Sequence, residues 1–145
     1  MKKSYIFGLM AMLFMALLAA NLVNASDDKK HKIVIQVSTD DVKTQAIAMN
    51  NAVNLQKHYG MDEIDIEIVA FGPGVGMLTA KNDQSSRVQS LLAQDISFSA
   101  CGNTLNKIEQ KKGKKPALTE GVVVVPAGAA QIMELQEKGY AYLRP

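Results

Sequence analysis

One cysteine is the residue best suited to covalent chemistry in this sequence. Cys101 is the only cysteine, and it directly follows the apolar segment 96–100 and precedes a stretch typical of a helix start. Free N–H groups and the dipole at a helix N-terminus stabilise an anion, so they favour the reactive thiolate of a cysteine placed there. Gly102 removes bulk beside the sulfur and lets a second backbone approach, as a persulfide transfer or a mixed disulfide would require. Asn103 and Thr104 complete the predicted site at this helix start.

Two other interpretations of Cys101 remain open at the level of sequence. A free cysteine commonly packs as a small hydrophobe, and one cysteine cannot form a disulfide within its own chain. A third possibility is a redox or metal sensor that uses Cys101 across a subunit interface. Burial of the sulfur in a sealed apolar site would favour packing, whereas an open site at a helix start would favour chemistry.

A glycine-rich segment is the second candidate for the site. The segment 72–76 reads Gly-Pro-Gly-Val-Gly and follows a predicted strand, but the spacing departs from a dinucleotide-binding fingerprint because Leu78 stands beyond Gly76. A tight turn is therefore the favoured interpretation. Its Gly72 and Gly74 could still place backbone donors near a small anion, and both are predicted to border the pocket.

The remaining polar candidates carry weaker signals. Helix capping accounts for Asp40 and Asp41. Asn50 lies in the middle of a predicted helix, where asparagine is a poor choice, so we expect it to hold a loop, a neighbouring subunit or the pocket. The histidines His31 and His58 make no metal-ligand spacing with a single cysteine. We therefore expect neither a metal nor an organic cofactor.

The N-terminal segment has the features of a secretory signal peptide. A basic start at Lys2 and Lys3 precedes an apolar run, and Val23 and Ala25 stand at the small positions before a cleavage point. We predict a signal peptide over residues 1–25, cleavage after Ala25, and one periplasmic domain over residues 26–145. An uncut N-terminal membrane anchor is the alternative; once cleaved, the domain is not expected to contact a membrane.

Charge argues against nucleic acid as a partner. The whole chain carries +2, and both excess charges belong to the predicted signal peptide, so the mature domain is neutral and has no general attraction to polyanions. One basic cluster, residues 107–115, is interpreted as a solvated helix end and loop.

Apolar patterning predicts alternating strands and helices. Near-continuous or alternating apolar runs predict strands at 33–37, 64–71, 96–100 and 121–125 and a short edge strand at 140–143. Amphipathic stretches predict helices at 42–58, at 77–92 with a break near 82–83, at 101–112 and at 127–138. This order is typical of a three-layer α/β/α fold with a mainly parallel sheet of about five strands. In such sheets, ligands bind beyond the carboxyl ends of the strands.

Several motifs along the predicted domain resemble the DsrE/DsrF-like proteins. They are the first strand 33–37, the helix with Asn50 and Asn54, and the segments 68–72, 98–105, 125–128 and 135–142. The resemblance implies an α/β/α fold, frequent oligomers and a cysteine after the third strand that carries sulfur as a persulfide. That cysteine matches Cys101.

The sequence therefore leads to one hypothesis about function and one rival. We expect a periplasmic sulfur carrier or transferase in which Cys101 accepts sulfane sulfur from a donor and passes it to an acceptor, one or both of them proteins. We also expect a homo-oligomer. The rival is a non-catalytic oligomeric module that binds a small ligand or a protein at the strand ends, with Cys101 as a structural residue.

Overall fold

A parallel sheet forms the centre of the computed structural model, which describes residues 30–145. The expected signal peptide, residues 1–25, lies outside the described residues. Five strands pair side by side in the order β4-β3-β2-β1-β5, and every pairing is parallel. Their bounds are β1 His31–Val37, β2 Ile64–Ala70, β3 Ile96–Cys101, β4 Val123–Val125 and β5 Ala141–Leu143.

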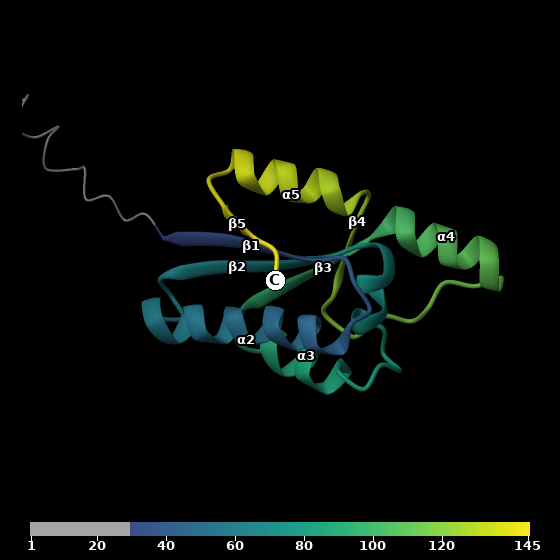
Figure 1. Cartoon of the computed structure of the whole chain (residues 1–145), viewed down its shortest axis with the longest axis horizontal. Helices are drawn as coiled ribbons and strands as arrows, with labels where there is room; N and C mark the ends of the chain where they lie inside the picture. The colour runs from purple at the N-terminus through teal and green to yellow at the C-terminus, as the bar shows by residue number, and fades with distance from the viewer. Residues whose placement is uncertain (1–29) are drawn as a thin grey trace, which may run out of the picture.

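Helices cover the two faces of the sheet unequally (Figure 1). Helices α2 (Val42–Tyr59) and α3 (Ser85–Leu92) lie on one face, and α5 (Gly128–Glu137) lies on the other. Helix α4 (Gly102–Lys112) projects beyond the carboxyl ends of the strands and buries only Leu105. The three-layer α/β/α prediction is therefore confirmed. Among residues 30–145, no helix combines the length and apolarity needed to cross a membrane.

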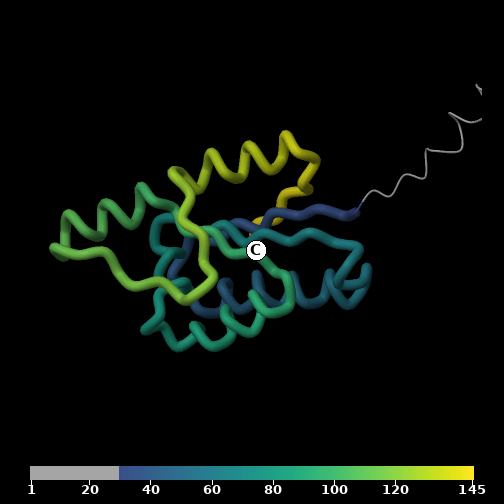
Figure 2. The backbone as a smooth tube through the Cα atoms, turned by 180° about the vertical axis from the view of Figure 1, so that it is seen from behind, coloured from purple at the N-terminus to yellow at the C-terminus, as the bar shows by residue number. Residues whose placement is uncertain are grey.

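The direction of the crossovers determines the face of the sheet on which each helix lies. The chain steps from β1 to β2, β3 and β4 in one direction, and then returns through α5 to β5 on the other side of β1. Right-handed crossovers place helices from steps in opposite directions on opposite faces. This explains why α5 is separated from α2 and α3. Seen from behind, α5 lies alone above the sheet (Figure 2).

The two faces of the sheet bury separate hydrophobic clusters. The larger cluster lies under α2 and α3 and includes the fully buried Met49, Ile68 and Phe98. A smaller one under α5 consists of Val34, Val69, Ile132 and Leu135. β1 and β2 supply side chains to both clusters, which explains the apolar runs 33–35 in β1 and 68–70 at the end of β2.

Helix α2 begins and ends where its capping residues predict. The Asp41 carboxylate accepts a hydrogen bond from the Thr44 N–H at 2.8 Å, and it thereby satisfies one of the free donors of the first turn. Gly60 ends the helix with a φ of +103°, a conformation that glycine adopts at little cost.

The predicted helix at 77–92 is wrong in its first half. Residues Gly72–Leu78 instead form a 3₁₀ helix, η1, and α3 begins only at Ser85. Three glycines and Pro73 disfavour an α-helix here. A pairing of Thr79 with Leu118 then holds the chain extended, and the Asn82 side chain accepts from the Gln84 N–H just before α3. The strand predicted at 121–125 is also shorter, because Gly121 has a φ of +91°.

Candidate functional site

Cys101 lies at the junction between a strand and a helix at the carboxyl end of the sheet. It is the last residue of β3 and the N-cap of α4. The residue is 6% exposed, and its neighbours come from η1 on one side and from the turn between β4 and α5 on the other. Segments that follow β2, β3 and β4 thus meet near Cys101.

Two glycines allow the backbone to approach Cys101 closely. A Cβ atom at Gly102 would lie 3.0 Å from the Val125 carbonyl oxygen. A Cβ atom at Gly128 would lie 3.0 Å from Phe71 and 3.3 Å from the Cβ atom of Cys101. Larger residues at either position would push α4 or α5 away from the end of the sheet. Both glycines therefore keep backbone groups within reach of the sulfur.

Thr104 connects the start of α4 to the glycine-rich segment. Its hydroxyl oxygen accepts a hydrogen bond from the Gly72 N–H at 2.9 Å, and Gly72 itself has a φ of +55°. Since the oxygen is held as an acceptor by Gly72, its own hydrogen is free to point at Cys101, the N-cap residue one turn earlier. The Asn103 N–H donates to the Pro126 carbonyl at 3.2 Å and ties the helix start to the turn after β4.

Hydrogen-bond donors lower the pKa of the Cys101 thiol. Burial of the sulfur raises this pKa, but the Gly128 N–H and the Thr104 hydroxyl outweigh burial, together with the N–H groups of Thr104 and Asn103. The net result is a pKa below the ordinary value of 9.0.

A polar contact beneath α5 holds the helix that supplies Gly128. The Glu67 carboxylate on β2 accepts hydrogen bonds from Ser99 Oγ at 2.6 Å and from Gln131 Nε2 at 2.9 Å. Gln131 stands one turn after Gly128 on α5. The contact therefore fixes the first turn of α5 over the sheet. The sequence analysis used residues 125–128 only for the family resemblance and did not assign Gly128 to the site, although a glycine three residues after a strand end was the available signal.

Two predicted pocket residues are used elsewhere in the fold. A Cβ atom at Gly74 would lie 2.3 Å from the Val37 carbonyl oxygen, so this glycine permits η1 to pack against the end of β1. The side-chain oxygen Oδ1 of Asn50 accepts a hydrogen bond from Arg87 Nη2 at 2.6 Å and joins α2 to α3. By contrast, Gly102, Asn103 and Thr104 directly follow Cys101 at the start of α4, and Gly72 donates to the Thr104 hydroxyl oxygen.

The arrangement can stabilise a thiolate and holds no ligand set for a metal. Among residues 30–145, no group of three or more His, Cys, Asp or Glu side chains could bind a metal ion. The site instead offers one nucleophilic sulfur with backbone and hydroxyl donors around it. This is the environment expected of a cysteine that forms and releases covalent sulfur adducts.

Comparison with known proteins places the chain in a family. The family model for DsrE/DsrF-like proteins matches residues 29–145. The chain belongs to the DsrE/DsrF-like family. Membership of this family suggests a function of the sulfur-relay type. No curated protein matches the sequence significantly.

A solved structure supports the same fold. A protein of unknown function from Methanobacterium thermoautotrophicum is 33% identical in sequence and superposes with a TM-score of 0.71. The match covers 79% of this chain and 99% of that chain. The three-layer fold with a parallel sheet is thus shared with a protein of similar sequence.

Proposed function

We propose that this DsrE/DsrF-like protein accepts sulfane sulfur on Cys101, holds it as a persulfide and passes it to an acceptor. The single observation that carries the proposal is the set of donors that lowers the pKa of the Cys101 thiol at the start of α4. A lowered pKa increases the thiolate fraction near neutral pH, and the thiolate is the nucleophile in exchange at sulfur.

The transfer step needs only a sulfane-sulfur donor. The Cys101 thiolate attacks the outer sulfur of a donor persulfide, R–S–SH. The new bond joins Sγ to that sulfur, the S–S bond of the donor breaks, and its electron pair leaves on R–S⁻. The proton stays on the transferred sulfur, so Cys–S–SH forms without net oxidation. Transfer to an acceptor thiolate is the same exchange in reverse.

The site geometry assigns a role to each neighbour in this step. The Gly128 N–H and the Thr104 hydroxyl stabilise the thiolate before attack and again when sulfur leaves. Gly72 holds the Thr104 oxygen in place. Gly102 lets the Val125 carbonyl pack closely against the start of α4. With Cys101 only 6% exposed, the site favours small donors or a donor thiol presented on a narrow segment.

Intact mass spectrometry tests the proposal. The purified chain is measured before and after incubation with polysulfide, with Cys101→Ser as the matched control. We expect a gain equal to one sulfur atom on the wild type, reversed by a thiol reductant and absent from the variant. A wild type that gains no sulfur, or a variant that gains as much, would overturn the proposal.

The low exposure of Cys101 favours one alternative, a binding module with a structural cysteine. Its 6% exposure is within the range of packed core residues. Alkylation distinguishes the two functions. A structural cysteine resists iodoacetamide until the protein unfolds, whereas a sulfur acceptor reacts in the native state.

A homo-oligomer belongs to the proposal and is supported by an unpaired sheet edge. β4 is an edge strand, and its Val123 and Val124 are 58% and 53% exposed. Exposed apolar side chains on an edge strand favour association with another chain. Light scattering tests this: the wild type should be larger than a monomer, and Val124→Lys should shift it towards monomer.

Export to the periplasm is likewise proposed, and it is supported by the sequence of residues 1–25. Expression of the full chain in a Gram-negative host, followed by fractionation and mass analysis, tests it. We expect a periplasmic product that begins at Ser26. A product that retains Met1 in the membrane fraction would identify an anchor instead.

A further inference from the structure

A hollow in the protein lies at the far end of α4. Its volume is about 380 Å³, and it is bounded by the last two turns of α4 and by two loop segments. Its lining residues are Thr79, Lys81, Ile108, Lys112, Lys114, Lys115, Pro116 and Ala117. Ile108 and Lys112 stand 7 and 11 residues after Cys101. At about 1.5 Å per residue, they lie roughly 10 and 16 Å along the helix from the cysteine.

We call this hollow the lysine pocket. Backbone hydrogen bonds hold the two loop segments that form one side of it. Thr79 pairs with Leu118 as an antiparallel bridge. The Ala80 N–H donates to the Ala117 carbonyl at 2.9 Å, and the Thr119 N–H donates to the Leu78 carbonyl at 2.9 Å. The two loop segments are thereby locked to each other at the end of η1. The pocket is therefore built on an ordered base.

The end of α4 forms the opposite wall. Gly113 adopts a φ of +77°, and its N–H donates to the Glu109 carbonyl at 2.7 Å, which closes the helix. The chain then turns back beneath α4, as Figure 2 shows. This reversal brings Pro116 and Ala117 opposite Ile108.

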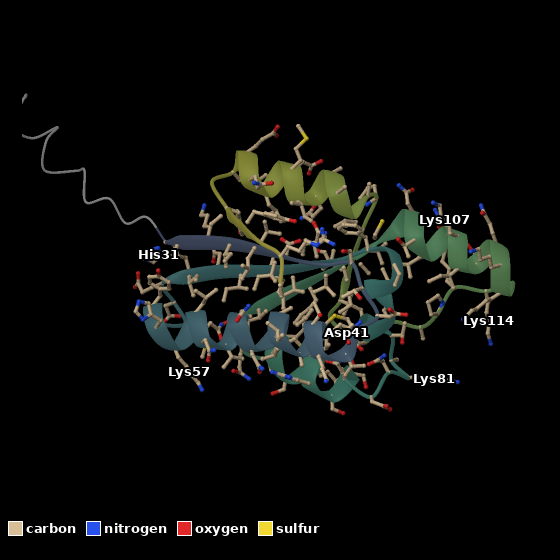
Figure 3. All side chains as sticks on the ribbon, viewed as in Figure 1. His31, Asp41, Lys57, Lys81, Lys107 and Lys114 are labelled. Carbon is tan, nitrogen blue, oxygen red and sulfur yellow. The ribbon has the colours of Figure 1, made fainter. Side chains whose placement is uncertain are left out.

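The lining combines an apolar interior with positive charge. Ile108, Pro116 and Ala117 are apolar, while four of the eight lining residues are lysines and none is acidic. Lys115 is partly neutralised by Glu109 at 3.5 Å. Within residues 30–145, Lys81, Lys112 and Lys114 form no salt bridge. Figure 3 shows Lys81 and Lys114 below the far end of α4, with Lys107 on its upper side.

We propose that the lysine pocket binds a small amphiphilic anion, a molecule with an apolar body and one or two carboxylate, sulfonate or phosphate groups. The volume lies within the range typical of small-molecule sites. The apolar interior would take up the body of the ligand, and the unpaired lysines would contact its acidic groups. Since the charges come from two segments far apart in sequence, residues 81 and 112–115, the fold concentrates them at one place.

The proposal is tested with a fluorescent anion and its uncharged analogue. Anilinonaphthalenesulfonate supplies two apolar ring systems and one sulfonate, and N-phenylnaphthylamine has the same rings without the charge. We expect saturable binding of the sulfonate to the folded chain, weakened by salt, and weaker binding of the uncharged analogue. Amide chemical shifts of the wild type should change at Thr79, Ile108 and Ala117.

Paired charge reversals locate the site. Lys81→Glu combined with Lys112→Glu should weaken sulfonate binding by about tenfold, because two favourable ion pairs become repulsive. Lys57→Glu combined with Lys107→Glu changes the net charge equally at positions that do not line the pocket. This control should bind within about twofold of the wild type, since surface charges outside the pocket are largely screened. Circular dichroism checks that both variants fold.

Three results would overturn the proposal. They are equal binding of the charged and uncharged probes, equal weakening by both pairs of reversals, and binding to vesicles of anionic phospholipid with none to the soluble sulfonate. The last result would assign the lysines to a membrane surface. Sulfur acceptance by Cys101 is measured separately, so failure here leaves the proposed function untouched.

Discussion

The two ends of α4 lie in contrasting environments although they belong to one short helix. At the N-terminal end, Cys101 is 6% exposed, and a Cβ atom at Gly102 or Gly128 would lie 3.0 Å from neighbouring atoms. At the C-terminal end, Lys111 and Lys112 are exposed, and Gly113 has nothing within 4 Å of where its Cβ atom would lie. The helix is thus closely packed at its first turn and exposed to solvent at its last.

This difference separates two kinds of chemistry. Packed backbone donors hold a single charge at a defined point, which suits a nucleophilic thiolate. Flexible lysine side chains over an apolar surface attract an anion without fixing its position closely. Substitutions at the first end should therefore act through geometry and be large. Substitutions at the second end should act through charge, be smaller and depend on salt.

The largest effect is expected at Gly74, where η1 packs against the end of β1. In Gly74→Ala the new Cβ atom would lie 2.3 Å from the Val37 carbonyl oxygen and 2.7 Å from its carbon. Neither backbone atom can move aside easily, so we expect a loss of about 2–3 kcal/mol in the free energy of unfolding. Urea denaturation measures it.

Gly76→Ala is the matched control for Gly74→Ala. It lies in the same 3₁₀ helix, and a Cβ atom there meets nothing within 4 Å. Its unfolding free energy should change by less than about 0.5 kcal/mol. Equal losses at the two positions would show that glycine flexibility, and not close packing, governs this segment.

The next effect is expected at Thr104. Thr104→Val keeps the shape but removes the hydroxyl that accepts from Gly72 and donates towards Cys101. We expect a loss of about 1 kcal/mol in stability. The pKa of the Cys101 thiol should also rise towards its ordinary value. The rate of iodoacetamide alkylation as a function of pH measures the pKa, because the thiolate is the species that reacts.

Thr104→Ser provides the control for this prediction. Serine retains the hydroxyl, so the alkylation profile should remain that of the wild type while the valine profile moves to higher pH. If both variants moved alike, the methyl group of Thr104 would matter more than its oxygen.

A smaller effect is expected in the pH dependence of stability. The folded-state pKa of Cys101 lies below the ordinary value of 9.0, so the folded protein binds fewer protons than the unfolded chain between the two values. Stability therefore rises with pH across this window, is fully gained above the unfolded-state value and is lost as the pH falls through the folded-state pKa.

Urea denaturation under reducing conditions, at several pH values, measures this dependence in the wild type and in Cys101→Ser. The free energy of unfolding of the wild type should increase relative to that of Cys101→Ser as the pH rises towards 9.0. A difference that does not change with pH would mean that the thiol pKa is the same in the folded and unfolded states.

The sequence was sufficient for the elements that are decided by local periodicity. Apolar runs predict β1 and β2, and the amphipathic pattern with Asp41 and Gly60 predicts α2 to within one residue of the observed end. The position of Cys101 between β3 and α4 follows from the same patterns. These features depend on residues that are close together in the sequence, so the sequence alone is sufficient to predict them.

The features that sequence reasoning missed depend on contacts between distant segments. Residues 72–84 resemble a turn and a helix, but pairing of Thr79 with Leu118 and packing of Gly74 on Val37 decide their conformation. Gly128 enters the site only because α5 returns over the sheet. The basic residues of 107–115 are exposed at a helix end and loop as predicted, but only the fold brings Lys81 beside them.

The smallest effect is expected at the open end of α4. Lys115 and Glu109 lie 3.5 Å apart, and their side chains are 51% and 49% exposed. Screening by solvent and the entropy of two long side chains offset most of the attraction between them. We expect Lys115→Gln to change the free energy of unfolding by less than about 0.5 kcal/mol, and by nothing measurable in high salt.

Glu109→Gln removes the same ion pair from the other side and leaves the lysine in the pocket. If the pair contributes little, the two variants should be equally stable, and they should differ only in binding anilinonaphthalenesulfonate. Glu109→Gln frees Lys115 and should strengthen binding, whereas Lys115→Gln should weaken it. A loss of more than about 1 kcal/mol in both variants would instead mean that the ion pair anchors α4. The two ends of the helix would then be alike in being held by specific contacts.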